Sequence, residues 1–162
     1  MKQVPLNIML VDDDDVDVMS LQRAFRQNNL TNPLFVANDG VEALEMLRGT
    51  NGRKKIVPTP KIIITDINMP NMNGLEFLKE LRADKNLYTS SVFVLTTSND
   101  DKHLIEAHNY NIAGYIIKPI NMENFSQAVA TLRNYWQLCF NDKIEIKEID
   151  DMDAYSDHVS LN

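Results

Sequence analysis

Short apolar runs alternate with amphipathic segments along most of the chain. Five runs have the length and composition of buried strands: residues 7–11, 34–37, 61–64, 91–95 and 114–117. Between and after them, apolar residues recur every three or four positions, as in helices packed on a sheet: residues 16–28, 41–47, 75–81, 101–109 and 122–139. This alternation predicts βαβ units, and therefore an α/β fold in which a doubly wound, five-stranded parallel sheet carries helices on both faces.

Two segments do not follow this alternation. Residues 49–60 contain two glycines, two prolines and Arg53-Lys54-Lys55; we expect a solvated loop, with a docking role for the basic residues as the alternative. Residues 141–162 contain seven acids and two lysines without clear periodicity. We expect this acidic C-terminal tail to be largely disordered, unless its three isoleucines add a strand or dock as an arm. The predicted organisation is one domain over residues 1–140, followed by the tail, 141–162.

Composition narrows the possible partners and compartment. The chain has 162 residues and a formal net charge of −7, which argues against non-specific binding to nucleic acid or to an anionic membrane, because both need basic surface. Cys139 is the only cysteine, so no internal disulfide can form. There is no secretory signal and no apolar run near the roughly 20 residues that span a bilayer. We expect a cytoplasmic protein.

Chemically active side chains follow four of the predicted strands. Asp12 and Asp13 end the first, Asp66 the third, Thr96 the fourth and Lys118 the fifth. In doubly wound sheets the ligand site lies beyond the carboxyl ends of the strands, so these residues are expected to converge.

Three carboxylates that converge repel one another, and a hard cation resolves the repulsion. Mg²⁺ suits such a site, because it takes oxygen ligands and needs only one or two protein carboxylates plus a phosphate oxygen. Lys118 adds a mobile positive charge and Thr96 a hydrogen-bond donor, which are the groups that hold a phosphoryl group. The site is therefore predicted to accept phosphate on Asp66.

The motifs at these strand ends resemble those of a known family. They are Val11-Asp12-Asp13, the run from Asp66-Ile67-Asn68-Met69-Pro70 to Gly74, Thr96, and Gly114-Tyr115-Ile116-Ile117-Lys118-Pro119. As an ordered set they resemble the receiver domains of two-component response regulators, of the single-domain chemotaxis type, over roughly residues 6–140. The resemblance implies a flavodoxin-like fold with strand order 2-1-3-4-5. The 49–60 loop and the aromatic last helix look similar to regulators that work with phytochrome-type kinases.

The resemblance also implies roles for the residues around the metal and the phosphoryl group. Asp66 would be the phosphoacceptor, taking a phosphoryl group from a sensor histidine kinase. Mg²⁺ would bind Asp13 directly, Asp12 mainly through water and Asn68 through its backbone carbonyl, with Asp66 as a further ligand. Lys118 would pair with the phosphoryl oxygens.

Other positions would transmit or tune the signal. Thr96 would move toward the phosphoryl group and Tyr115 would turn inward behind it, which would alter the face that contacts an unknown downstream protein. Thr97 is bulkier than the small residue expected there. Thr97, Ser98 and Asn68 stand where the family tunes hydrolysis, so they put the lifetime of the phosphorylated state in doubt. Asp14 and Asp15 extend the acidic pair, and we expect them to be solvated or capping residues.

Three other functions and one assembly remain open at this level. An aspartyl-nucleophile phosphatase would need a second acid two positions after the nucleophile, where this chain has Asn68. A receiver-like binding module that is never phosphorylated is a second alternative. A dinucleotide enzyme is poorly supported, because no Gly-rich loop follows the first strand. Finally, Tyr135, Leu138 and Phe140 lie off the main stripe of the last helix, so a homodimer through that helix is plausible.

Overall fold

The computed structural model describes residues 6–97, 101–118, 127, 130, 131 and 134. Strands and helices alternate strictly in this part of the chain: β1 (Ile8–Val11), α1 (Asp15–Gln27), β2 (Leu34–Ala37), α2 (Gly40–Arg48), β3 (Ile62–Asp66), α3 (Gly74–Ala83), β4 (Ser91–Thr97), α4 (Asp101–His108) and β5 (Gly114–Lys118). The bounds lie close to those that the apolar patterns predict.

The strands form one parallel sheet in the order β2-β1-β3-β4-β5. The central strand β3 is buried along its whole length, as expected of a parallel strand covered on both faces. The predicted flavodoxin-like fold and strand order are confirmed. The order also places the carboxyl ends of β1, β3, β4 and β5 along one edge of the sheet, with β1 and β3 in direct contact.

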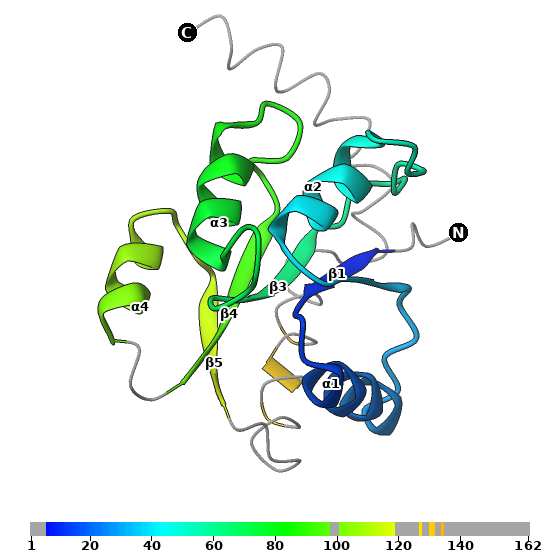
Figure 1. Ribbon diagram of the computed structural model, residues 1–162. Helices are drawn as coiled ribbons and strands as arrows, with labels where there is room; N and C mark the ends of the chain where they lie inside the picture. Colours follow the sequence, from blue (N-terminus) through cyan, green and yellow to red (C-terminus); the bar gives the residue numbers. More distant parts are fainter. Residues whose placement is uncertain (1–5, 98–100, 119–126, 128–129, 132–133, 135–162) are drawn as a thin grey trace, which may run out of the picture.

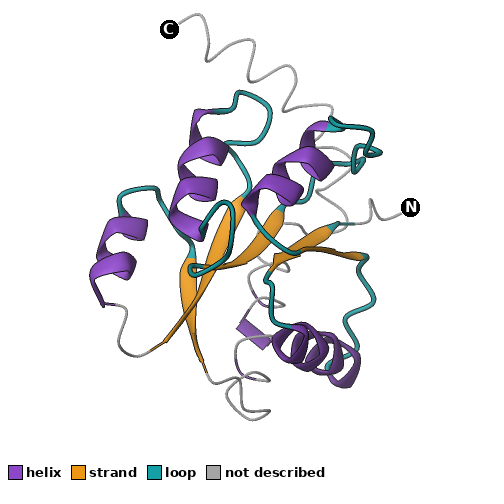
Figure 2. Ribbon diagram, in the orientation of Figure 1, coloured by secondary structure: helices purple, strands orange, loops and turns teal. Residues whose placement is uncertain are grey.

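Each face of the sheet has its own apolar core, because successive side chains of a strand point to opposite faces. Figure 1 shows α1 on one face and α2, α3 and α4 on the other. Met9, Ile63 and Val94 pack with the second group of helices, whereas their neighbours Ile8, Ile64 and Leu95 pack with α1. The secondary structure alone is drawn in Figure 2.

The helices begin where the sequence supplies side-chain acceptors. Asp14 accepts a hydrogen bond from the Val16 backbone N–H (2.8 Å), so the expected capping role falls to Asp14, while Asp15 is the first residue of the helix and is exposed. Asp39 caps α2, and Asn73 forms a capping box with Glu76 at the start of α3. These caps set the positions at which α1, α2 and α3 leave the loops beside the strand ends.

The 49–60 loop is only partly the solvated segment predicted. Its exposed basic residue Arg53 lies 3.6 Å from a Glu42 oxygen and 3.4 Å from a Glu45 oxygen on α2. Ile56 is buried, and Ser90 donates a 2.7 Å hydrogen bond to the Pro60 carbonyl. The loop is therefore anchored at its C-terminal half, because it contributes an apolar side chain to the core.

Several predictions fall outside the described residues: most of the last helix, the homodimer contact proposed for it, and the acidic tail. Residues 127, 130, 131 and 134 are helical, in agreement with the predicted helix over 122–139, whereas the residues of its apolar stripe lie outside the described residues. Where the structure describes the chain, none of its helices has the length and apolar character that a membrane crossing requires.

Candidate phosphoacceptor and cation site

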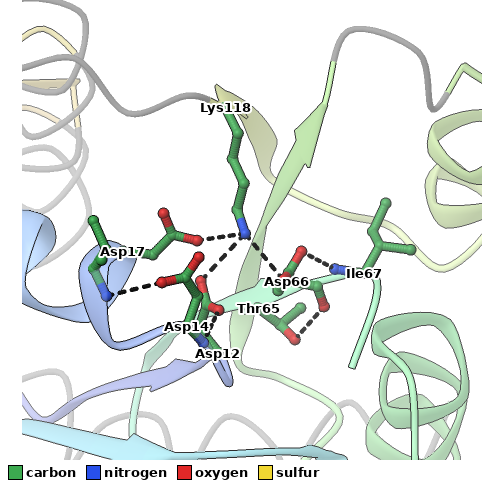
Figure 3. A network of polar contacts seen from close by, with 8 residues as sticks. Asp12, Asp14, Asp17, Thr65, Asp66, Ile67 and Lys118 are labelled. Atoms are coloured by element: carbon green, nitrogen blue, oxygen red, sulfur yellow. Dashed lines mark hydrogen bonds and ion pairs between the residues drawn. The ribbon is translucent and has the colours of Figure 1, made fainter. Parts of the chain in front are cut away.

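Side chains from three strand ends meet at one point (Figure 3). Asp12 follows β1, Asp66 is the last residue of β3 and Lys118 is the last residue of β5. The Lys118 Nζ lies 3.0 Å from Asp66 Oδ2 and 3.4 Å from Asp12 Oδ2. Asp13 completes the cluster, because Asp12, Asp13 and Asp66 each offer an oxygen within 4.8 Å of the others. The predicted convergence of acids and amine is present.

Backbone N–H groups fix the orientation of the two buried carboxylates. The Ile67 N–H donates to Asp66 Oδ1 at 2.8 Å, and the Asp14 N–H donates to Asp12 Oδ1 at 2.9 Å. One oxygen of each carboxylate is thereby held by its own loop. The other oxygen of each faces Lys118.

Gly74 allows the loop after Asp66 to turn tightly. Its N–H donates to the Ile67 carbonyl at 2.8 Å. A Cβ at this position would lie 2.1 Å from the Asp66 carbonyl oxygen and 2.9 Å from the Ile67 Cα. Only glycine permits this approach of α3 to the end of β3.

A second contact holds the same loop from the neighbouring side. Asn71 has a left-handed backbone (φ 63°), and its amide donates a 2.7 Å hydrogen bond to Asp39, the cap of α2. The Gly40 N–H donates to the Met72 carbonyl at 3.2 Å. The loop that carries the candidate phosphoacceptor is thus tied to the start of α2.

Burial dominates the electrostatics of the cluster. It raises the pKa of Asp12 to about 7, against the opposing influence of the Asp14 N–H and of Lys118. Burial also raises the pKa of Asp66, partly offset by its hydrogen bond to Lys118. Burial alone would lower the pKa of Lys118, but its close contacts with the Asp17 and Asp66 carboxylates raise it above its usual value, so the lysine is charged.

The donor set suits a divalent cation. Asp12 is fully buried, and its Oδ2 has no hydrogen-bond partner within the described residues, although Lys118 lies 3.4 Å away. A buried carboxylate oxygen in this condition is costly unless a positive charge approaches it. Oxygen ligands from three carboxylates are those that hard divalent ions prefer. Asp12, Asp13 and Asp66 are therefore suited to hold such an ion.

The remaining predicted residues lie around the cluster in different settings. Thr96 is buried at the end of β4, and its hydroxyl donates to the Thr97 carbonyl at 3.1 Å. Asn68 and Thr97 are exposed. Tyr115 on β5 has 48% of its surface exposed, so its ring is not packed behind Thr96. Ser98 lies outside the described residues.

Sequence reasoning missed one charged residue of the cluster. Asp17 lies in the first turn of α1, and its Oδ2 is 2.6 Å from Lys118 Nζ, the shortest of the three lysine contacts. The available signal was its position: Asp17 is the third residue of the helix that directly follows the acidic strand end, so it lies in the helical turn nearest to the predicted site. Gly74 and the Asp39–Asn71 contact were also missed, because they join segments that are separate in the sequence.

Comparisons with known proteins agree with this arrangement. Residues 8–130 match the family model described as response regulator receiver domain. A solved two-component response regulator from Legionella pneumophila is 38% identical, with a TM-score of 0.68 over 80% of this chain and 98% of that one.

Two further solved structures are similar to this chain. The phosphorylated cyanobacterial phytochrome response regulator RcpA is 27% identical, with a TM-score of 0.68 over 82% of this chain and 94% of that one. The Mn²⁺-bound form of response regulator Rcp1 is 25% identical, with the same TM-score and the same coverage of both chains.

Proposed function

Because the chain belongs to the response regulator receiver domain family, as its strand-end motifs predicted, we propose that it is a stand-alone two-component response regulator phosphorylated on Asp66. One observation carries the proposal. Asp66 ends the central strand with one oxygen fixed by the Ile67 N–H and the other 3.0 Å from Lys118, among carboxylates that suit a cation. Phosphoryl transfer needs a nucleophile, a positively charged side chain beside it and a bound divalent cation, and this cluster offers the first two together with ligands for the third.

In the proposed reaction, an Asp66 carboxylate oxygen attacks the phosphorus of a phosphohistidine on a sensor histidine kinase. The new O–P bond forms as the N–P bond breaks, and the leaving imidazole keeps the electron pair of the broken bond. Asp66 must be ionised to attack. Burial opposes its ionisation, whereas Lys118 and the Ile67 N–H favour it. After transfer, Lys118 pairs with a phosphoryl oxygen and the Thr96 hydroxyl turns from the Thr97 carbonyl toward the phosphoryl group.

The chain's own residues would hold Mg²⁺ beside the phosphoacceptor: Asp13 and Asp66 directly, Asp12 mainly through water, and Asn68 through its backbone carbonyl. When bound, the ion would offset the charge that gathers on the phosphoryl oxygens. The existence of a Mn²⁺-bound form of the similar protein Rcp1 supports the binding of a divalent ion.

Signalling would follow from a change at the β5 edge. Tyr115 and Ile117 are each 48% exposed there, and α4 adds Ile105, which is 68% exposed. We infer that Tyr115 turns inward when Thr96 moves, which changes this face for a downstream protein.

The likeness to a phytochrome response regulator supports a phytochrome-type kinase as the phosphodonor. Thr97 and Ser98 would tune how quickly the acyl phosphate hydrolyses. The expected location of the protein is the cytoplasm.

The test compares wild type with Asp66→Asn, and with Asp14→Asn as the matched control, because asparagine also caps helices. Each protein is incubated with Mg²⁺ and acetyl phosphate, and labelling is measured by intact mass. Wild type and Asp14→Asn should gain one phosphoryl group that Asp66→Asn does not. Equal labelling of all three proteins would refute the assignment. A wild type that no donor labels would favour the binding module, and rapid hydrolysis of a generic phosphomonoester would favour the phosphatase.

A further inference from the structure

Asp17 makes the shortest of the three carboxylate contacts of Lys118, yet it lies on α1 and on none of the strand ends that form the proposed site. Its Oδ2 is 2.6 Å from Nζ, against 3.0 Å for Asp66 and 3.4 Å for Asp12. Its side chain is 13% exposed, and Figure 3 shows it reaching the ammonium from α1. Asp17 does not cap this helix, because Asp14 already does so. Its contact with Lys118 is the interaction that distinguishes it.

Three carboxylates already surround the Lys118 Nζ, and any further anion must compete with them for the charge of the ammonium group. If Asp66 is phosphorylated, as proposed above, a phosphoryl oxygen enters that competition. Asp66 carries that group, and Asp12 belongs to the carboxylate cluster that would hold the cation. Asp17 is therefore the partner that can give up its contact with Lys118.

The charge of Asp17 also acts on the cation and the phosphoryl group in opposite directions. Asp12, Asp13, Asp17 and Asp66 bring four negative charges against one positive charge, a formal sum of −3 when all are ionised. A divalent cation is favoured by every one of those charges, whereas a dianionic phosphoryl group is opposed by them. Removing the Asp17 charge therefore weakens cation binding and strengthens phosphoryl binding.

We propose that Asp17 is a positioning residue that holds the Lys118 ammonium in the unphosphorylated protein and releases it to the phosphoryl group on Asp66. Its carboxylate thereby favours cation binding and opposes the phosphorylated state. The proposal rests on the proposed function for its second half only, because the hold on Lys118 and the effect on the cation belong to the unphosphorylated protein.

The experiment uses Asp17→Asn, with Asp15→Asn as the matched control. Asp15 lies two residues away on the same helix and is exposed, so the control removes the same charge without a contact to Lys118. Mg²⁺ affinity is measured calorimetrically on the unphosphorylated proteins. At saturating Mg²⁺, the affinity for beryllium fluoride, a stable mimic of the phosphoryl group, is measured as well. The ¹⁵N resonance of the Lys118 ammonium reports whether its partner has changed.

Asp17→Asn should weaken Mg²⁺ binding on the order of fivefold, which is the Coulomb effect of one charge on a nearby divalent ion, and should tighten beryllium fluoride binding by a similar factor. The Lys118 resonance should shift. Asp15→Asn should change either affinity less than about twofold, because an exposed charge is screened. Asp17→Glu, which keeps the charge, should restore most of the Mg²⁺ affinity.

Two results would overturn the proposal. One is an Asp17→Asn protein that matches Asp15→Asn in both affinities and in the Lys118 resonance. The other is a parallel loss of both affinities, because a merely structural role of the ion pair would damage the whole site. The Mg²⁺ and resonance measurements need no phosphoryl transfer. If wild type were never labelled by acetyl phosphate, the proposed function would fail while these two measurements still decided whether Asp17 holds Lys118.

Discussion

Replacing Asp12 by asparagine should stabilise the cation-free protein. The Asp12 side chain is completely buried, and its Oδ2 has Lys118 at 3.4 Å as its positive partner but no hydrogen-bond donor among the described residues. Ionising this carboxyl in the folded protein therefore costs free energy. An asparagine keeps the acceptor for the Asp14 N–H and carries no charge, so it removes that cost.

The magnitude follows from the pKa of Asp12, which burial raises from 3.8 to about 7. This difference of about 3 units, at 1.36 kcal/mol per unit, sets an upper limit of about 4 kcal/mol for the penalty. Because this pKa already includes the attraction to Lys118, we expect Asp12→Asn to gain up to about 4 kcal/mol in the free energy of unfolding at pH 8. Because the pKa is higher in the folded than in the unfolded state, the penalty grows as pH rises from about 4 to about 7 and is constant above that.

The assay is urea unfolding of wild type and Asp12→Asn in EDTA at pH 5 and pH 8. The advantage of the variant should be larger at pH 8, and added Mg²⁺ should stabilise wild type more than the variant. Asp84→Asn is the control of opposite sign. The pKa of Asp84 is lowered, first by the Asn86 N–H and further by Arg48, so this variant should lose stability relative to wild type above pH 4. A variant of Asp12 that is less stable than wild type at pH 8 in EDTA would refute the reasoning.

Two further predictions concern positions outside the charged cluster. Gly74→Ala should reduce the rate of phosphorylation by acetyl phosphate at least about 100-fold, because a Cβ 2.1 Å from the Asp66 carbonyl oxygen must displace the phosphoacceptor loop by about 1 Å. The control Gly114→Ala, whose Cβ would meet only the Phe93 ring at 3.4 Å, should keep the wild-type rate. Equal rates for the two variants would contradict this prediction. Arg82→Lys should lower the free energy of unfolding by about 2 kcal/mol, measured in the same urea titration. The reason is that the Arg82 guanidinium donates to four backbone carbonyls that a lysine cannot span, those of Tyr88, Ser90, Tyr110 and Asn111. The control Arg48→Lys breaks only surface ion pairs and should cost less than about 1 kcal/mol.

The sheet and most of the cluster were predictable because both depend on local patterns. Buried parallel strands are continuous apolar runs, and each ends at a polar residue that the chain needs for its turn. The three isoleucines before Asp66 thus predict both the strand and the place of its acid. Parallel pairing then brings all such ends to one edge, so the strand pattern alone predicts that Asp12, Asp66 and Lys118 lie together.

Asp17, Gly74 and Asn71 were not predictable by the same reasoning. The helical period places Asp17 in the first turn of α1, but only the packing of α1 against the sheet brings its carboxylate to Lys118. Gly74 reads as a helix start, and its close approach to the Asp66 carbonyl depends on how α3 leaves the loop. Asn71 reads as a turn residue, and its bond to Asp39 joins two loops 32 residues apart.

The fold, the strand ends and the acids and lysine that meet there can thus be inferred from the order of residues alone, since hydrophobic periodicity and strand direction are properties of short segments. In contrast, tertiary packing sets which carboxylate lies nearest to Lys118, how tightly the phosphoacceptor loop turns and what holds that loop in place. These features depend on distances between segments far apart in the chain. A shift of about 1 Å between these segments would change such contacts, and the local sequence pattern does not determine distances at that precision.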